Sequence, residues 1–97
     1  MFKFESLSEM DYLIAVKRNG YALQYVKEQT EAVCLEAVKR DGYALRYVKE
    51  QTEAVCLEAV KRNGDALRYV EIKSERVLAI ATTYRGAYVA IFANENP

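Results

Sequence analysis

The chain has 97 residues, 52% hydrophobic and 29% charged, which is enough for one domain with a modest core and excludes a disordered chain. Its 14 basic and 14 acidic residues give a formal net charge of zero, so the overall charge attracts neither nucleic acid nor an anionic membrane. No apolar stretch reaches transmembrane length and no secretory signal pattern begins the chain, so we expect a cytoplasmic protein without membrane contact.

A short N-terminal segment, residues 1–7, precedes the first recognisable repeat. Within it Phe2 and Phe4 alternate with the charged residues Lys3 and Glu5. Such alternation is compatible with a short strand. We favour an N-terminal arm that lays both rings on the first repeat.

The rest of the chain follows a period of 22 residues. Residues 52–73 match residues 30–51 at 17 positions, and residues 8–29 match them at 15. The glycines keep the same spacing, at Gly20, Gly42, Gly64 and Gly86. A fixed period of this kind is typical of stacked repeats. The chain is therefore predicted to be a single repeat domain, 1–97, whose three helical repeats are followed by a divergent fourth copy at 74–97.

Each central repeat is predicted to begin with an amphipathic helix. Thr30 can cap this helix through its side-chain oxygen, and Glu31 follows in the first turn, where a negative charge suits the helix dipole. Apolar residues at helical spacing fall on one side, at Val33, Cys34, Leu35, Ala37 and Val38. Gly42 follows the basic last turn, where a glycine typically ends a helix in the left-handed conformation.

A shorter second helix is predicted from Tyr43 to about Lys49. Its inner side is expected to hold Ala44, Leu45, Tyr47 and Val48. Neither helix is long enough to persist alone, so stability must come from packing helix on helix and repeat on repeat, with small alanines at the closest approaches. The predicted fold class is all-α: tandem helix-turn-helix repeats that form a small solenoid.

The two cysteines, Cys34 and Cys56, occupy the same place in adjacent repeats. Equivalent atoms of stacked helices lie about 8–10 Å apart, more than the roughly 7 Å that a disulfide tolerates between Cα atoms. We therefore predict two free, buried thiols. The chain has no histidine, no metal-ligand spacing and no nucleophile motif, so the sequence predicts no metal site, no cofactor and no enzyme.

Basic residues recur at the end of each first helix. We call this set the basic row: Lys17, Arg18, Lys39, Arg40, Lys61 and Arg62. A second set would lie on the shorter helices, at Arg46 and Arg68. Evenly spaced cations can follow a phosphate backbone, with Tyr25, Tyr47 and Tyr69 as stacking partners. We expect those tyrosines to face inward, however, and duplication copies any surface residue, so a solvated charged face is favoured over nucleic-acid binding.

The fourth copy keeps the period but loses the charged surface. Ile80 stands where the central repeat has Glu36, so the outer face of the copy turns apolar. Its β-branched and aromatic residues also fit a β-hairpin over residues 79–92, with Arg85 and Gly86 at the turn. We favour the helical interpretation because the glycine stays in phase with the period.

The apolar fourth copy predicts a protein contact. It gathers more large side chains than one neighbouring repeat can bury, namely Ile80, Tyr84, Tyr88, Ile91 and Phe92. An exposed patch of this kind usually marks association. Ile14 of the first repeat likewise replaces a glutamate. Either other segments of the chain cover these two ends, with Phe2 and Phe4 on the first repeat, or the ends of two copies meet in a homodimer.

The spacing L-x-A-V-x-x-x-G-x-A-L-x-x-V occurs here as Leu35, Ala37, Val38, Gly42, Ala44, Leu45 and Val48. It resembles a short helical repeat of bacterial and giant-virus proteins that is known only as a domain of unknown function. The resemblance covers roughly residues 8–73 in three copies, and the fourth copy departs from it at the leucines and the outer charges. It implies a tandem helical array and brings no catalytic residue or activity.

These features predict a non-enzymatic protein-binding module whose fourth copy carries the contact. The small size of the chain fits an adaptor, or an inhibitor that occludes a site on another protein, including a phage anti-defence protein of the anti-CRISPR kind. The alternative is a nucleic-acid-binding helical solenoid that uses the basic row.

Overall fold

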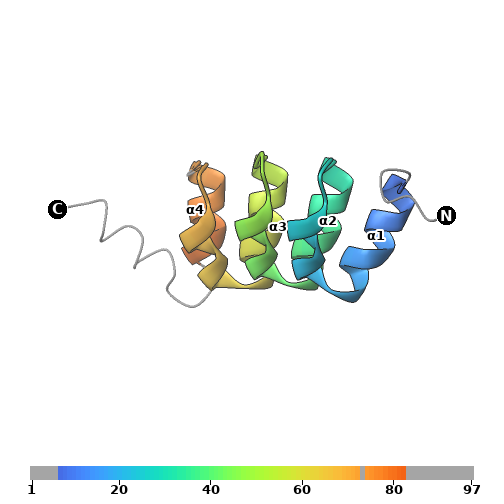
Figure 1. Ribbon diagram of the computed structural model, residues 1–97. Helices are drawn as coiled ribbons and strands as arrows, with labels where there is room; N and C mark the ends of the chain where they lie inside the picture. The colour runs from blue at the N-terminus through green and yellow to red at the C-terminus, as the bar shows by residue number, and fades with distance from the viewer. Residues whose placement is uncertain (1–6, 73, 83–97) are drawn as a thin grey trace.

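The computed structural model describes residues 7–72 and 74–82 and confirms the all-α class (Figure 1). Within these residues, four α-helices alternate with three 3-10 helices. The α-helices are α1 (Glu9–Arg18), α2 (Glu31–Arg40), α3 (Glu53–Arg62) and α4 (Glu75–Thr82). The 3-10 helices are η2 (Gly20–Tyr25), η3 (Gly42–Tyr47) and η4 (Gly64–Tyr69). Across the described residues there is no β-strand.

The α-helices begin at the predicted caps. The Thr30 hydroxyl accepts a hydrogen bond from the Val33 backbone N–H at 3.2 Å, and Thr52 caps α3 in the same way. The cap of α1 is reciprocal, because the side chains of Ser8 and Asp11 each accept from the other's backbone N–H. These bonds satisfy donors that a helix start leaves unpaired, and losing one costs about 1 kcal/mol.

The second helix of each repeat is a 3-10 helix that begins at the glycine. Asp41 ends α2 and also caps η3, because its side chain accepts from the Tyr43 N–H at 3.0 Å. Asparagines play the same part in the neighbouring repeats, at Asn19 and Asn63. The predicted second helix is therefore present, but it ends at Tyr47, two residues earlier than the sequence suggests.

The glycine between the two helices serves close packing, so the predicted left-handed helix end is wrong. Asp41 is extended at φ −153°, and the backbone of Gly42 is not left-handed. A Cβ built on Gly42 would lie 2.6 Å from the Ala59 carbonyl oxygen in the next α-helix. A Cβ on Gly20 would meet the Ala37 carbonyl oxygen at the same distance. Only glycine leaves room for a neighbouring backbone that comes so near.

The α-helices stand side by side in chain order from α1 to α4 (Figure 1). Each packs on the next, and η2 and η3 each pack on the α-helix of their own repeat and on that of the following one. A core runs along this row, and its largest fully buried side chains include Val16, Leu23, Val38, Leu45, Val60, Leu67 and Val77. Ala37 and Ala44, predicted at the closest approaches, have no exposed surface.

The start of the fourth copy is helical. Helix α4 includes residues 79–82, where the first strand of the alternative hairpin would lie, so the hairpin is wrong for that stretch. Residues 83–97 and residues 1–6 of the N-terminal arm lie outside the described residues. None of the helices in the described part of the chain has the length and apolar character needed to cross a membrane.

Candidate functional site: the tyrosine–arginine face

Tyrosines and arginines gather on the three 3-10 helices. Each of these helices ends in a tyrosine, and η3 and η4 carry an arginine just before it. Because neighbouring 3-10 helices pack on each other, these side chains come together across the repeats. We call the set the tyrosine–arginine face: Tyr21, Tyr25, Tyr43, Arg46, Tyr47, Arg68 and Tyr69.

The rings of this face are held by contacts between repeats. Tyr21 meets Tyr47 edge to face, with ring centroids 5.8 Å apart and ring planes at 74°. Tyr43 meets Tyr69 in the same way, at 6.0 Å and 82°. Such pairs contribute about 0.5–1.5 kcal/mol beyond the burial of their area. The rings therefore stabilise the junctions and are themselves fixed in place.

Arg46 lies against two of these rings. Its guanidinium carbon is 5.3 Å from the ring centroid of Tyr47 and 5.5 Å from that of Tyr69. A cation at this distance is attracted to an exposed aromatic face by about 0.5–1 kcal/mol. Arg46 remains an exposed residue. Its charge is thus held in a defined position and stays accessible to solvent.

The tyrosines are more open than the sequence suggests. The predicted inward placement is wrong for Tyr25, which is 78% exposed, and only partly right for Tyr47 and Tyr69, which are half-buried. The last two rest on a tyrosine of the repeat before them. Tyr25 belongs to the first repeat, so within the described residues no tyrosine of a preceding repeat packs against its ring. Most of its surface is therefore exposed.

Two phenol groups of the face interact with aspartates. Burial of Tyr21 and, as a second cause, the Asp41 carboxylate raise the pKa of Tyr21 above its ordinary value of 10, so this phenol is uncharged at neutral pH. The Tyr43 hydroxyl donates to the Asp65 carboxylate of the next repeat at 3.3 Å. The face therefore combines aromatic surface, hydroxyl groups and the positive charge of its arginines.

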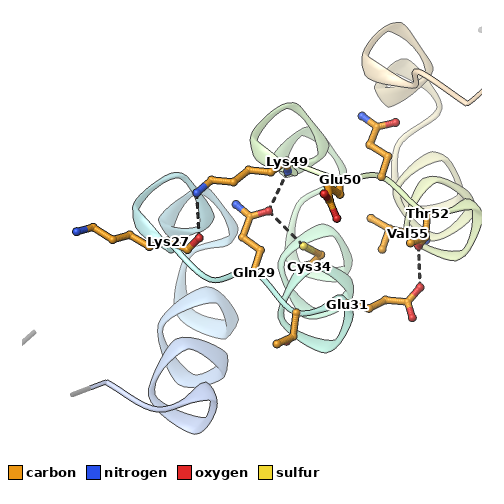
Figure 2. A pocket seen from close by; sticks show the side chains of 10 residues that line it. Lys27, Gln29, Glu31, Cys34, Lys49, Glu50, Thr52 and Val55 are labelled. Carbon is orange, nitrogen blue, oxygen red and sulfur yellow. Dashed lines mark hydrogen bonds between the residues drawn. The ribbon is translucent and has the colours of Figure 1, made fainter. Parts of the chain in front are cut away.

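A polar groove of about 420 Å³ lies where the loops after η2 and η3 meet (Figure 2). Gln29 crosses the junction there: its side-chain nitrogen donates to the Tyr47 carbonyl oxygen at 2.8 Å, and its side-chain oxygen accepts from the Lys49 N–H at 2.9 Å. The Lys49 ammonium in turn donates to the Lys27 carbonyl oxygen at 3.0 Å. The groove is thus the edge of a repeat junction, and its polar groups bond one repeat to the next.

Gln51 makes the same pair of bonds one repeat later. It donates to the Tyr69 carbonyl oxygen and accepts from the Glu71 N–H, both at 2.8 Å. These glutamines are not among the predicted site residues, although their recurrence after 22 residues is a signal from which a shared role could be predicted. Each amide pairs one backbone donor and one backbone acceptor, so these residues join repeats.

Both cysteines are buried and free, as predicted. The Cys34 thiol donates to the Gln29 side-chain oxygen at 3.6 Å, and the Cys56 thiol donates to that of Gln51 at 3.2 Å. Burial raises the pKa of both thiols to about 11. They are therefore protonated at neutral pH and serve packing, since the thiolate is the reactive form of cysteine.

The helix caps also join repeats. The Thr52 hydroxyl donates to the Glu31 carboxylate of the preceding helix at 2.7 Å, and the Ser74 hydroxyl donates to Glu53 at 2.6 Å. An equivalent bond links α2 to α1. The first-turn glutamates, expected only to suit the helix dipole, thus also bind the next cap.

The basic row lies at the C-terminal ends of α1, α2 and α3. All six of its members are exposed. Arg40 and Arg62 reach back to the preceding helix, where their Nε atoms donate to the carbonyl oxygens of Arg18 at 3.3 Å and Lys39 at 2.7 Å. The other predicted cations, at positions 46 and 68, lie on the 3-10 helices, so the eight cations form two sets.

The predicted protein-contact residues lie mostly beyond the described part. Ile80 belongs to α4, but its side chain is outside the described part, as are the later residues Tyr84, Tyr88, Ile91 and Phe92. Their contact role stays a prediction. Ile14, the counterpart of Ile80 in the first repeat, is 51% exposed. Within residues 7–72 and 74–82, no group of three or more cysteines, aspartates or glutamates is placed to hold a metal ion.

A protein-family model described as a domain of unknown function matches the chain twice, over residues 12–52 and 30–73. Together the two matches span most of the chain and include every residue of the tyrosine–arginine face. The comparison with curated proteins and the comparison with solved structures gave no match.

Proposed function

The chain belongs to the family called DUF4116, a domain of unknown function, and we propose that it is a non-enzymatic module that binds another protein. The observation that carries the proposal is the tyrosine–arginine face. Tyrosine and arginine are enriched among the few residues that supply most of the energy of protein interfaces. On this face they lie together on three successive 3-10 helices.

The side chains of the face are already held in place by their contacts, which favours binding. A mobile side chain costs about 0.5–1.5 kcal/mol to immobilise in an interface, and a side chain fixed beforehand avoids much of that cost. Tyr47 is fixed by its contact with Tyr21, and Arg46 is fixed against Tyr47, yet both keep accessible surface. The middle of the face therefore offers a rigid aromatic anchor beside a defined positive charge.

The chemistry of the face suits a partner that presents carboxylates beside apolar groups. The fourth copy extends the proposed contact through the apolar residues Ile80, Tyr84, Tyr88, Ile91 and Phe92. A binding module of this kind would act in the cytoplasm as an adaptor or as an inhibitor. An anti-defence protein would use the same physical means, because it would occupy a site on its target.

Capture of proteins from the native host tests the proposal. We expect Arg46→Glu and Tyr47→Asp each to reduce recovery of the specific partners by roughly tenfold or more, the effect of losing one strong interface residue. Lys39→Glu is the matched control, because it also reverses one exposed charge but lies in the basic row. Folded Arg46→Glu and Tyr47→Asp variants that recover the wild-type partners would contradict binding by this face.

The fourth copy is tested separately in the same experiment. Tyr88→Asp and Phe92→Asp should lower recovery if the apolar copy takes part in the contact. If both variants stay folded and recover the wild-type partners, the fourth copy is not part of the binding surface.

Nucleic-acid binding is the second candidate function, supported by the exposure of all six members of the basic row. Cations along the ends of stacked helices can pair with phosphates, and such binding weakens steeply as salt rises. This function predicts that the wild type is retained on immobilised DNA at low salt and that Lys39→Glu with Lys61→Glu abolishes retention. The double variant should leave protein capture unchanged. Wild-type protein that passes through the column at low salt would eliminate this candidate.

A further inference from the structure

Within the described residues, the first repeat carries an uncovered copy of the surface that joins the repeats. An apolar cavity of about 510 Å³ opens there, and we call its lining the first-repeat end face: Leu7, Tyr12, Ala15, Ala22, Tyr25, Val26 and Lys27. Ala15 and Ala22 are only half-buried, whereas Ala37 and Ala44, one period later, have no exposed surface. The same positions are thus closed in the middle of the array and open at its start.

Tyr25 shows the same difference between the first repeat and the later ones. It is 78% exposed, whereas its counterparts Tyr47 and Tyr69 are half-buried against the repeat before them. A further repeat stacked before the first one would cover Tyr25 as well. The end face therefore has the shape of a repeat junction with one side missing.

Two backbone groups at this face lack the partner that their counterparts have. In the second repeat the Tyr47 carbonyl and the Lys49 N–H are both bonded by Gln29. Their counterparts in the first repeat are the Tyr25 carbonyl and the Lys27 N–H. The residue in the place of Gln29 is Leu7, which has no amide. One donor and one acceptor of the described first repeat are thereby left for a partner.

The last described helix, α4, carries one part of the other half of a junction. At each described junction the cap hydroxyl of one helix donates to the first-turn glutamate of the helix before it, as Ser74 does to Glu53. Glu75 is the next glutamate of this series and is exposed at the start of α4. Ser8 is the exposed cap of α1 at the other end. The start of α4 and the start of α1 therefore carry the two partners of such a bond.

We propose that copies of this chain associate head to tail, with the α4 end of one copy against the first-repeat end face of the next. The contact continues the stacking that joins α1 to α2 and α2 to α3, and it brings Glu75 of one copy to Ser8 of the other. The two copies use different surfaces, so the contact is heterologous, and further copies can add at both free ends.

Sedimentation of single variants and of their mixture tests this arrangement. Ala22→Arg blocks the first-repeat end face, and Glu75→Arg weakens the α4 end. We expect the mass of the wild type to rise with concentration and each variant alone to stay monomeric at concentrations where the wild type associates. An equimolar mixture should form a one-to-one dimer, because each variant keeps the end that the other lacks. Gln24→Arg is the matched control and should associate like the wild type, since it adds the same charge to η2 outside the end face.

Two results would overturn the proposal, and a third would explain a monomeric wild type. A wild type that remains monomeric at millimolar concentration has no such contact. A variant mixture that stays monomeric while the wild type dimerises would indicate a symmetric dimer. If Phe2→Asp with Phe4→Asp turns a monomeric wild type into an associating chain, the end face is covered by residues 1–6 of its own chain. Each variant is first shown to be folded by its circular dichroism and urea unfolding curve.

Discussion

A single glutamine side chain joins neighbouring repeats where the 3-10 helices end. Gln29 bonds a carbonyl and an N–H of the second repeat and also accepts from the Cys34 thiol. Gln51 repeats this arrangement one period later. The bonds to the Tyr47 and Tyr69 carbonyl oxygens are partly buried, and a buried backbone group left without its partner costs about 1–3 kcal/mol. We therefore expect the stability of the array to depend on these two residues.

We expect Gln29→Leu to lower the free energy of unfolding by about 1–3 kcal/mol, because the Tyr47 carbonyl and the Lys49 N–H both lose their partner. Urea unfolding measures the change. Gln24→Leu is the matched control, since this exposed glutamine makes one bond, to the Tyr21 carbonyl, and should change stability by no more than about 0.5 kcal/mol. Equal effects of the two substitutions would contradict the joining role of Gln29.

The buried thiols make stability depend on pH above neutrality. Cys34 and Cys56 have a folded-state pKa of about 11, above the ordinary value of 9. The unfolded chain loses these protons first, so their stabilising contribution is complete below pH 9 and is lost as pH rises through 11. We expect the urea midpoint to fall over this range, and to fall less in a Cys34→Ala, Cys56→Ala double variant. The same fall in both proteins would assign the effect to other groups.

At the scale of elements, the starts of the α-helices are predictable and the second helices are less so. Thr30 and Thr52 mark the starts because a cap acts through its own side chain within one turn. The six-residue helix η3 depends on Asp41 and on packing against α2 and α3. A short apolar segment does not reveal from sequence alone whether it forms an α-helix or a 3-10 helix.

We expect Thr52→Ala to destabilise the protein by about 1–2 kcal/mol, because α3 loses its cap and the bond from that cap to Glu31. Thr52→Ser should retain most of the stability, since Ser74 makes both bonds in the native chain. The urea midpoints of the two variants measure the difference. If serine is as damaging as alanine, the loss comes from the methyl group and the cap is unimportant.

At the scale of the whole molecule, the alanines distinguish a closed junction from an open end. Ala44→Leu should destabilise the protein by about 1–3 kcal/mol, because it forces extra atoms into a fully packed interface. Ala22→Leu should cost much less, since its side chain faces the open cavity of the first repeat. Urea melts at low protein concentration make this comparison. Equal losses would mean that the end face is as closed as the inner junctions.

The candidate site could be predicted only in part. Arg46, Arg68 and the last tyrosine of each 3-10 helix stand out in the sequence because they recur with the period. Their arrangement does not follow from the sequence, because Arg46 touches Tyr69 and Tyr47 touches Tyr21 across repeat junctions. The pattern within one repeat predicts that Tyr47 faces inward. In the structure its ring packs on Tyr21 of the preceding repeat and is half-buried at the surface.

The sequence by itself determined the period, the all-α class, the helix caps and the burial of both cysteines, since each depends on local propensity or on a pattern that can be read along the chain. Only the tertiary structure decided what the recurring glycines, glutamines and tyrosines do. Gly42 is needed because the Ala59 carbonyl of the next helix lies where a Cβ would stand, and Gln29 acts on backbone groups of the next repeat. Duplication copies a residue regardless of its surroundings, so only the stacking of repeats shows which copies are buried in a junction and which stay exposed.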